Sequence, residues 1–137
     1  MDYHQFVDEV AERADVSREQ AEALTRATLW TLGERITGGE ARHIAGQLPV
    51  ELQTRLIAAE EEAEGFSLDE FIRRTAERAG VDRGTADIGT AAVFATLRDT
   101  ISGDDVRHMM SQLPLEFREV APGPRLSDVR VTGGDLP

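Results

Sequence analysis

The sequence predicts an all-α protein of eight helices, built as two four-helix repeats that pack as one helical domain with pseudo-twofold symmetry. Two observations predict the helices. Apolar residues recur at three- and four-residue spacing, and Ser, Thr or Asp precedes these runs where a helix N-cap belongs. A third observation predicts the repeats, because the 137-residue chain matches itself at an offset of 65 residues.

The self-match needs no gaps. Residues 6–51 align with residues 71–116, and 20 of these 46 positions are identical, which indicates an internal duplication. Each repeat should therefore contain the same elements in the same order. We divide the chain into a first repeat (1–65), a second repeat (66–121) packed with the first as one domain, and a flexible C-terminal tail (122–137) that is rich in Pro and Gly.

The first helix of each repeat follows from a single apolar face. The residues at helical spacing are Tyr3, Phe6, Val7, Val10 and Ala14 in the first repeat and Leu68, Phe71, Ile72, Thr75 and Ala79 in the second. Ser67 and Glu70 have the spacing of a capping box, and Gly80 suits the end of the helix that they begin.

A longer second helix is expected over about residues 18–36 and 83–101, after the N-caps Ser17 and Asp82. Its predicted inward face is Ala21, Leu24, Thr28, Leu32 and Ile36, matched by Ala86, Val93, Leu97 and Ile101. Trp30 lies on this helix, and its counterpart is Ala95. It either fills the core on one side only or marks a pocket or an exposed contact.

The stretches TGGE at 37–40 and SGDD at 102–105 end the long helices and cap short third helices over roughly 39–47 and 104–112. Glycine-containing helix entries can also receive an anion. Capping is the better interpretation here, because the chain has no Lys and no phosphate-binding glycine motif.

A structural motif, Gln-Leu-Pro, follows each short helix: Gln47, Leu48 and Pro49, then Gln112, Leu113 and Pro114. We interpret it as a corner. The two leucines should be buried anchors, and the two prolines should start a fourth helix, where a missing N–H leaves no bond unmade. The two glutamines are placed to satisfy backbone groups at the turn.

Around this motif the chain resembles the domain of unknown function 2267 family of bacteria and archaea. The first copy matches that family's pattern at Leu32, Arg35, Ile36, Gln47, Leu48 and Pro49, and the second at Leu97, Ile101, Gln112, Leu113 and Pro114. Thr100 stands where the first copy has Arg35. The resemblance covers about residues 2–121 and implies a small helical protein, but it brings no activity with it.

Composition limits the function further. The chain has no Cys, which excludes disulfides, thiolate metal sites and cysteine nucleophiles. A net charge of −11 disfavours nucleic-acid binding. We expect no membrane span, no signal peptide, a cytoplasmic location and no bound cofactor. All the basic residues are Arg, which is typical of a GC-rich genome such as that of a salt-loving archaeon or an actinobacterium.

His43 and His108 occupy equivalent positions in the two repeats. If the repeats pack about a twofold axis, the two imidazoles could face each other and, with a nearby Asp or Glu, ligate zinc or iron. His4, the third histidine, has no counterpart, since position 69 is Asp69. The alternative is a half-exposed histidine in the last part of a short helix, where positive charge is favourable.

Two other charged features have structural interpretations. The acidic run at 60–64 could bind a hard cation, but it lacks the spacing of a calcium loop and is interpreted as a solvated linker. Arg13 and Arg78 recur in both repeats and are expected to form interhelical ion pairs with Glu12, Glu77 or Glu9.

No catalytic constellation is evident, and we predict that the protein is not an enzyme. The favoured function is a non-catalytic protein-interaction module, with an unknown protein partner or a second copy of itself. The alternative is a small-molecule or metal-binding protein that uses a cleft between the repeats near His43 and His108. A decoy that mimics nucleic acid is a third possibility, but a solvated acidic surface explains the same charge.

Overall fold

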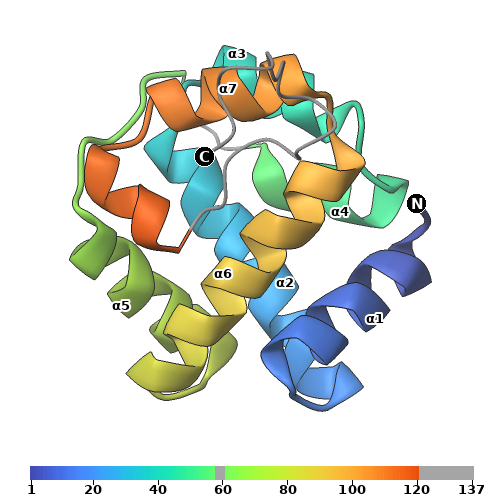
Figure 1. The fold of residues 1–137 in the computed structure, drawn as a ribbon. Helices are drawn as coiled ribbons and strands as arrows, with labels where there is room; N and C mark the ends of the chain where they lie inside the picture. The colour runs from blue at the N-terminus through green and yellow to red at the C-terminus, as the bar shows by residue number, and fades with distance from the viewer. Residues whose placement is uncertain (58–60, 121–137) are drawn as a thin grey trace, which may run out of the picture.

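The computed structural model describes residues 1–57 and 61–120, and it confirms the all-α prediction (Figure 1). The α-helices are α1 (Tyr3–Ala14), α2 (Arg18–Arg35), α3 (Gly38–Ala45), α4 (Val50–Leu56), α5 (Leu68–Ala79), α6 (Arg83–Thr100) and α7 (Gly103–Ser111). A 3-10 helix, η1 (Leu115–Glu119), follows. The described residues contain no strand, and none of their helices is both long and apolar enough to cross a membrane.

The prediction of an eighth α-helix is wrong for the described residues. The segment after Pro114 forms a five-residue 3-10 helix instead. It buries only Phe117, whereas Leu115 is 72% exposed, so one tight turn is enough to anchor it. Ile57 lies beyond the end of α4 and is 46% exposed. The predicted flexible tail lies outside the described residues.

Side-chain caps begin most of the helices. Ser17, Thr37, Ser67, Asp82 and Ser102 each accept a hydrogen bond from the backbone N–H three residues later, as the sequence predicts. The full capping box occurs instead at the start of α1, between Asp2 and Gln5. At Ser67 the expected box is incomplete, because the Glu70 carboxylate pairs with two arginines of its own helix.

The long helices α2 and α6 cross at the centre of the molecule, and α1 and α5 flank them on opposite sides (Figure 1). α1 packs against α6 as well as α2, and α5 packs against α2 as well as α6. Each half of the chain therefore covers the long helix of the other half. Every residue predicted for the inward faces of the long helices is buried.

The crossing of α2 and α6 explains one difference between the two halves. Leu24 and Gly89 are 65 residues apart and face each other, and a Cβ on Gly89 would lie 2.6 Å from a methyl carbon of Leu24. Two leucines would not fit at this contact, so a large residue on one helix is matched by the smallest residue on the other.

Ion pairs join the two halves at their flanks. Arg13 donates to Asp99 at 2.5 Å and to the Thr96 hydroxyl at 3.0 Å. Arg78 makes the equivalent contacts, to Glu34 at 2.8 and 2.9 Å and to Thr31. The two arginines therefore form interhelical ion pairs, but their partners are Asp99 and Glu34 and not the predicted acids. The pair of Arg13 with Glu9 lies within α1.

Candidate metal centre between α3 and α7

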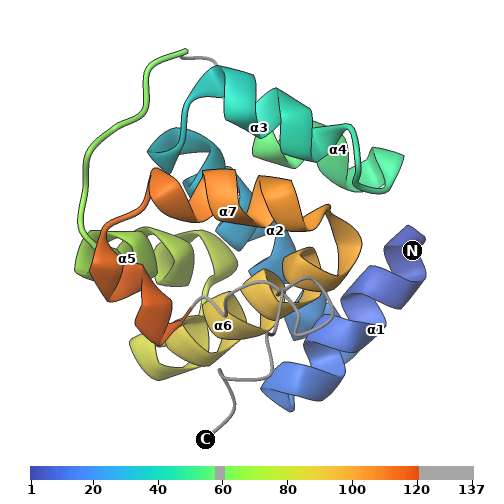
Figure 2. The same cartoon turned by 45° about the horizontal axis from the view of Figure 1, so that its top comes forward.

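The short helices α3 and α7 lie side by side over one end of the crossed pair (Figure 2). Each carries an acid and, three residues later, a histidine: Glu40 and His43 on α3, and Asp105 and His108 on α7. Residues three apart share one face of a helix. The two helices therefore bring two carboxylates and two imidazoles together, and we call these four residues the His–carboxylate cluster.

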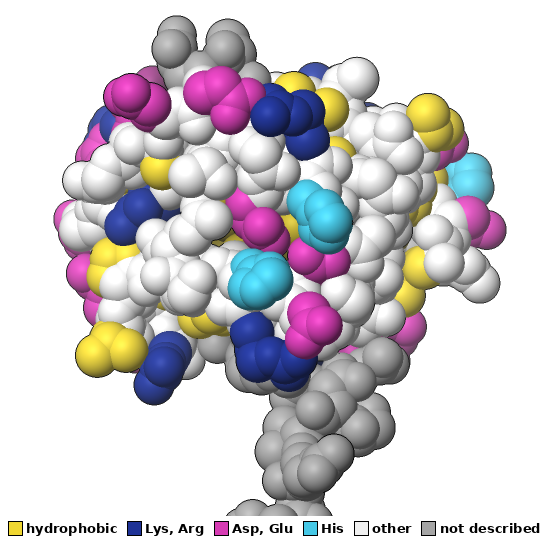
Figure 3. Space-filling model, turned by 90° about the horizontal axis from the view of Figure 1, so that it is seen from above, with side chains coloured by type: hydrophobic (Ala, Val, Ile, Leu, Met, Phe, Trp, Pro, Cys, Tyr) yellow, Lys and Arg dark blue, Asp and Glu magenta, His cyan; other side chains and the backbone are white. Residues whose placement is uncertain are grey.

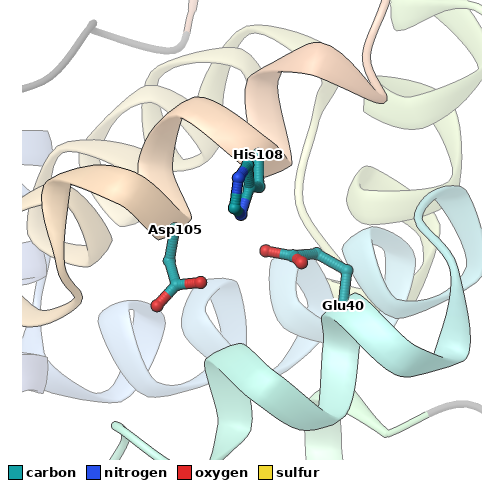
Figure 4. A group of neighbouring side chains, drawn as sticks. All are labelled: Glu40, Asp105 and His108. Carbon is teal, nitrogen blue, oxygen red and sulfur yellow. The ribbon is translucent and has the colours of Figure 1, made fainter.

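The distances within the cluster are short. His43 Nε2 lies 3.2 Å from Asp105 Oδ1. One ligand atom from each of Glu40, Asp105 and His108 lies within 4.8 Å of the others, and Figure 4 shows these three side chains directed toward a common point. From above α3 and α7, two histidine rings lie close together at the surface with acidic side chains beside them (Figure 3).

Asp105 is the fixed member of the cluster. Its side chain is almost fully buried, and its Oδ2 accepts hydrogen bonds from Ser102 Oγ at 2.8 Å and from Gln47 Nε2 at 2.5 Å. Oδ1 is left facing His43. A carboxylate oriented by two donors on one oxygen, with the other directed at an imidazole, has the arrangement of a supported metal ligand.

Glu40 is held differently. Its Oε1 atom is buried and has no hydrogen-bond partner among the described residues. Burial raises the pKa of the Glu40 carboxyl group, and the nearby negative charge of Asp105 raises it further, against smaller opposing effects of His108 and His43. An ionised carboxylate with an unpaired buried oxygen is costly, and a bound cation would remove that cost.

The Gln-Leu-Pro motif supports this end of the molecule by contacts between the halves. Gln47 Oε1 accepts a hydrogen bond from the backbone N–H of Ser102, and Gln112 Oε1 accepts one from that of Thr37, both at 2.8 Å. These are the N-cap residues of α7 and α3. The sequence analysis placed the glutamine contacts at the turn itself, and Gln47 Nε2 does lie 3.4 Å from the carbonyl oxygen of His43.

The remaining residues of the motif behave as a corner. Leu48 and Leu113 are buried, as predicted. Pro49 and Pro114 are the N-cap residues of α4 and η1. The sequence predicts each proline as the first residue of its helix, so each helix begins one residue later than predicted. Arg35, the other polar residue of the family pattern, donates to the carbonyl oxygens of Phe66 at 2.8 Å and Gln112 at 3.1 Å.

Sequence reasoning identified His43 and His108 but treated Glu40 and Asp105 only as helix-capping positions. The signal that could have found them is their spacing. In both halves an acid precedes the histidine by three residues, so the two share a helix face. His4 lies elsewhere, on α1, where its Nδ1 contacts Arg18 at 2.7 Å.

The chain was compared with known proteins. No curated protein matches it. The model of one family, described as uncharacterized conserved protein (DUF2267), matches residues 3–120. This match includes both helical halves, both copies of the Gln-Leu-Pro motif and all four residues of the cluster. The chain therefore belongs to the DUF2267 family.

Proposed function

We propose that this protein binds a divalent transition-metal ion, with Zn²⁺ as the ion that its ligands suit best, at the His–carboxylate cluster. One observation carries the proposal: α3 and α7 bring two imidazoles and two carboxylates to one place. This develops the metal-binding alternative of the sequence analysis, and it adds Glu40 and Asp105 to the two histidines.

The spacing of the cluster is compatible with a small ion. Zinc bonds to histidine nitrogen and carboxylate oxygen are about 2.1 Å long, so tetrahedral ligand atoms lie about 3.4 Å apart. The pair His43–Asp105 already has nearly that separation, at 3.2 Å. One ligand atom from each of Glu40, Asp105 and His108 lies within 4.8 Å of the others, and rotation of the exposed His108 and partly exposed Glu40 side chains can shorten these distances.

The donor set also selects among metals. Imidazole nitrogen suits zinc, iron, copper and nickel, whereas Ca²⁺ and Mg²⁺ prefer ligands made only of oxygen. No thiolate competes, because the chain has no Cys. The proposal is one of binding without a reaction, in keeping with the prediction that the protein is not an enzyme.

A bound ion would join the two halves. Two ligands come from α3 in the first half and two from α7 in the second. An ion that binds the folded state alone stabilises it by about 2.7 kcal/mol when the free ion is at one hundred times its dissociation constant. For a chain of this size that corresponds to a rise of roughly 10 °C in the unfolding midpoint.

Calorimetric titration of the metal-free protein with Zn²⁺ tests the proposal. We expect one equivalent to bind, and we expect His43→Ala and His108→Ala each to weaken binding at least tenfold. His4→Ala is the matched control, since it removes a histidine that lies outside the cluster. Mg²⁺ should not compete. Equal zinc affinity in the wild-type protein and both cluster variants would eliminate the proposal.

The protein-interaction function stays a prediction, with one observation in its favour. Val50 and Leu115 follow the prolines of the two corners, and each is 72% exposed despite being apolar. A partner or a second copy of the chain could cover them. Light scattering of the wild-type protein and of a Val50→Ser, Leu115→Ser variant tests self-association: a monomer in both cases would exclude a homo-oligomer.

A cytoplasmic location also remains a prediction.

We also infer that the two halves are duplicated units related by pseudo-twofold symmetry. The inference is supported by reciprocal contacts between equivalent residues of the two halves: Gln47 contacts Ser102, and Gln112 contacts Thr37. Because α1 packs on α6 and α5 on α2, neither half should fold alone. A peptide of residues 1–65 should therefore show no cooperative thermal unfolding. Cooperative unfolding of this peptide would contradict the inference.

A further inference from the structure

A second site lies away from the His–carboxylate cluster, in a pocket between α2, α4 and α5. Its volume is about 730 Å³, and its walls include Trp30, Arg26, Arg55, Arg78 and Ile57. Pockets of roughly 300–1,000 Å³ are the usual size for small-molecule ligands. None of the four residues of the cluster lines this pocket, so what it binds is independent of the metal.

Three of the residues that line the pocket have no similar counterpart in the other half of the chain. The positions 65 residues later carry different side chains: Ala95 in place of Trp30, Ala91 in place of Arg26 and Val120 in place of Arg55. The ion pair of Arg78 with Glu34 at the edge of the pocket does occur in both halves, because Arg13 and Asp99 form the equivalent pair. The shared residues hold the helices together in both halves. The indole ring and two guanidinium groups are additions to one side, and they all face the same pocket.

Trp30 offers an aromatic surface. Its side chain is 53% exposed, which is unusual for the largest apolar residue in a core-forming helix. The guanidinium of Arg78 lies 4.0 Å from the ring centroid and is itself held by Glu34. The ring is therefore stacked on one side by a fixed cation, while it still lines the pocket. With Ile57, it forms an exposed apolar wall of the pocket.

The formal charge of the lining is balanced, because three arginines (Arg26, Arg55 and Arg78) face three glutamates. Glu34 and Glu64 face the pocket but are paired with arginines at 2.8 to 3.1 Å, and Glu62 is the remaining acid. Arg26 pairs with Glu22 at 3.2 Å. Arg55 has no ion-pair partner among the residues that the structure describes, so its planar fork of donors is available to a carboxylate.

We propose that this pocket binds a small aromatic carboxylate, with the ring packed against Trp30 and Ile57 and the carboxylate held by Arg55. The apolar wall and the available guanidinium line one pocket, so a ligand needs both a planar apolar part and a single anionic group to use them together. A cation with the same ring would leave the guanidinium of Arg55 without a partner, and an anion without a ring would leave the indole uncovered.

Trp30 is the only tryptophan in the chain, so intrinsic fluorescence reports directly on this pocket. The probe is 3-phenylpropionate, compared with phenethylamine (the same ring with a positive charge) and propionate (the anion without the ring). We expect a saturable blue shift of the emission with 3-phenylpropionate, at a concentration at least tenfold lower than either control requires. No saturable change, or equal binding of phenethylamine, would overturn the proposal.

Two variants separate the roles of the residues. Arg55→Gln should weaken 3-phenylpropionate binding at least tenfold, whereas Arg118→Gln, which removes an arginine outside the pocket, should not change it. Trp30→Ala, followed by calorimetry because the fluorophore is lost, should abolish binding while the circular dichroism spectrum stays helical. Wild-type affinity in Arg55→Gln would refute the role of that guanidinium, and wild-type affinity in Trp30→Ala would refute the site.

Discussion

Glu40→Gln is expected to make the metal-free protein more stable and at the same time a poorer zinc binder. The buried Oε1 of Glu40 has no partner among the described residues, and the Asp105 carboxylate lies nearby. An ionised Glu40 is therefore unfavourable in the folded state. Leaving a buried polar group unsatisfied costs about 1–3 kcal/mol. The glutamine side chain keeps an uncharged polar atom at this position, so the gain comes only from removing the desolvated charge and its repulsion by Asp105, and we expect about 1 kcal/mol.

The pH dependence of this gain follows from the pKa of Glu40, which is raised in the folded state above its ordinary value of 4.5. Below that ordinary value both states are protonated, and the carboxyl group contributes nothing. As the pH rises, the unfolded chain ionises first, so the folded state loses stability until the folded pKa is passed. The advantage of the Gln variant should therefore be complete at pH 7.5 and absent at pH 3.5.

Urea unfolding of the metal-free proteins at the two pH values measures the stability, and calorimetry at pH 7.5 measures zinc affinity, which should fall at least tenfold. Glu51→Gln, on the exposed face of α4, is the control for removing a negative charge from an acidic protein. If Glu40→Gln destabilises the protein at pH 7.5, the carboxylate is better satisfied than the structure indicates. A stabilised variant with unchanged zinc affinity would show that Glu40 is no ligand.

Three further predictions concern the fold. Gly33→Ala should destabilise the protein by about 3 kcal/mol in urea unfolding, because its Cβ would lie 2.1 Å from the carbonyl oxygen of Leu56 and α4 would have to move. Gln112→Ala should cost about 1 kcal/mol, the net value of one hydrogen bond, since it removes the acceptor for the Thr37 N–H. Glu70→Gln should lower the unfolding midpoint at pH 7 but not at pH 2. Hydrogen bonds from two arginines lower the pKa of Glu70 in the folded state to about 2. The contribution of these bonds to stability is therefore lost as the pH falls from 4.5 toward 2.

Each of these variants has a matched control or a decisive outcome. Gly84→Ala, in α6, places its Cβ 3.6 Å from the nearest atom and should be neutral or stabilising. Wild-type stability of Gly33→Ala would mean that α2 and α4 are further apart than described. The control for Gln112→Ala is Gln53→Ala, because Gln53 bonds the nearby carbonyl oxygen of Leu48 within one half. An equal loss of stability in the two variants would show that the contact between halves is worth no more than a local one. For Glu70, a midpoint difference that persists at pH 2 would contradict the lowered pKa.

The sequence predicted the helices well because the interactions that form them are local. An N-cap such as Ser17 or Thr37 bonds a backbone group three residues away, and an apolar stripe repeats every three or four residues. The errors came where local rules give little information. The segment after Pro114 has the composition of a short α-helix, but Leu115–Glu119 forms a 3-10 helix in which Phe117 is the buried residue.

The candidate site was only half predictable, for the same reason. His43 and His108 could be identified from the repeated motif, because equivalent positions are visible in one dimension. Glu40 and Asp105 share their helix faces, but nothing local brings α3 beside α7. That approach depends on how α2 and α6 cross, on the close fit of Leu24 against Gly89 and on glutamines that reach N-caps of the other half.

By itself the sequence determined the helical class and the positions of most helices and corners, because these rest on interactions between residues that are close in the chain. The tertiary structure alone decided that four side chains meet between α3 and α7 and that Trp30 lines a pocket with Arg55 instead of filling the core. Such groupings join residues from 25 to 68 positions apart, and only the packing of whole helices sets the distances between them.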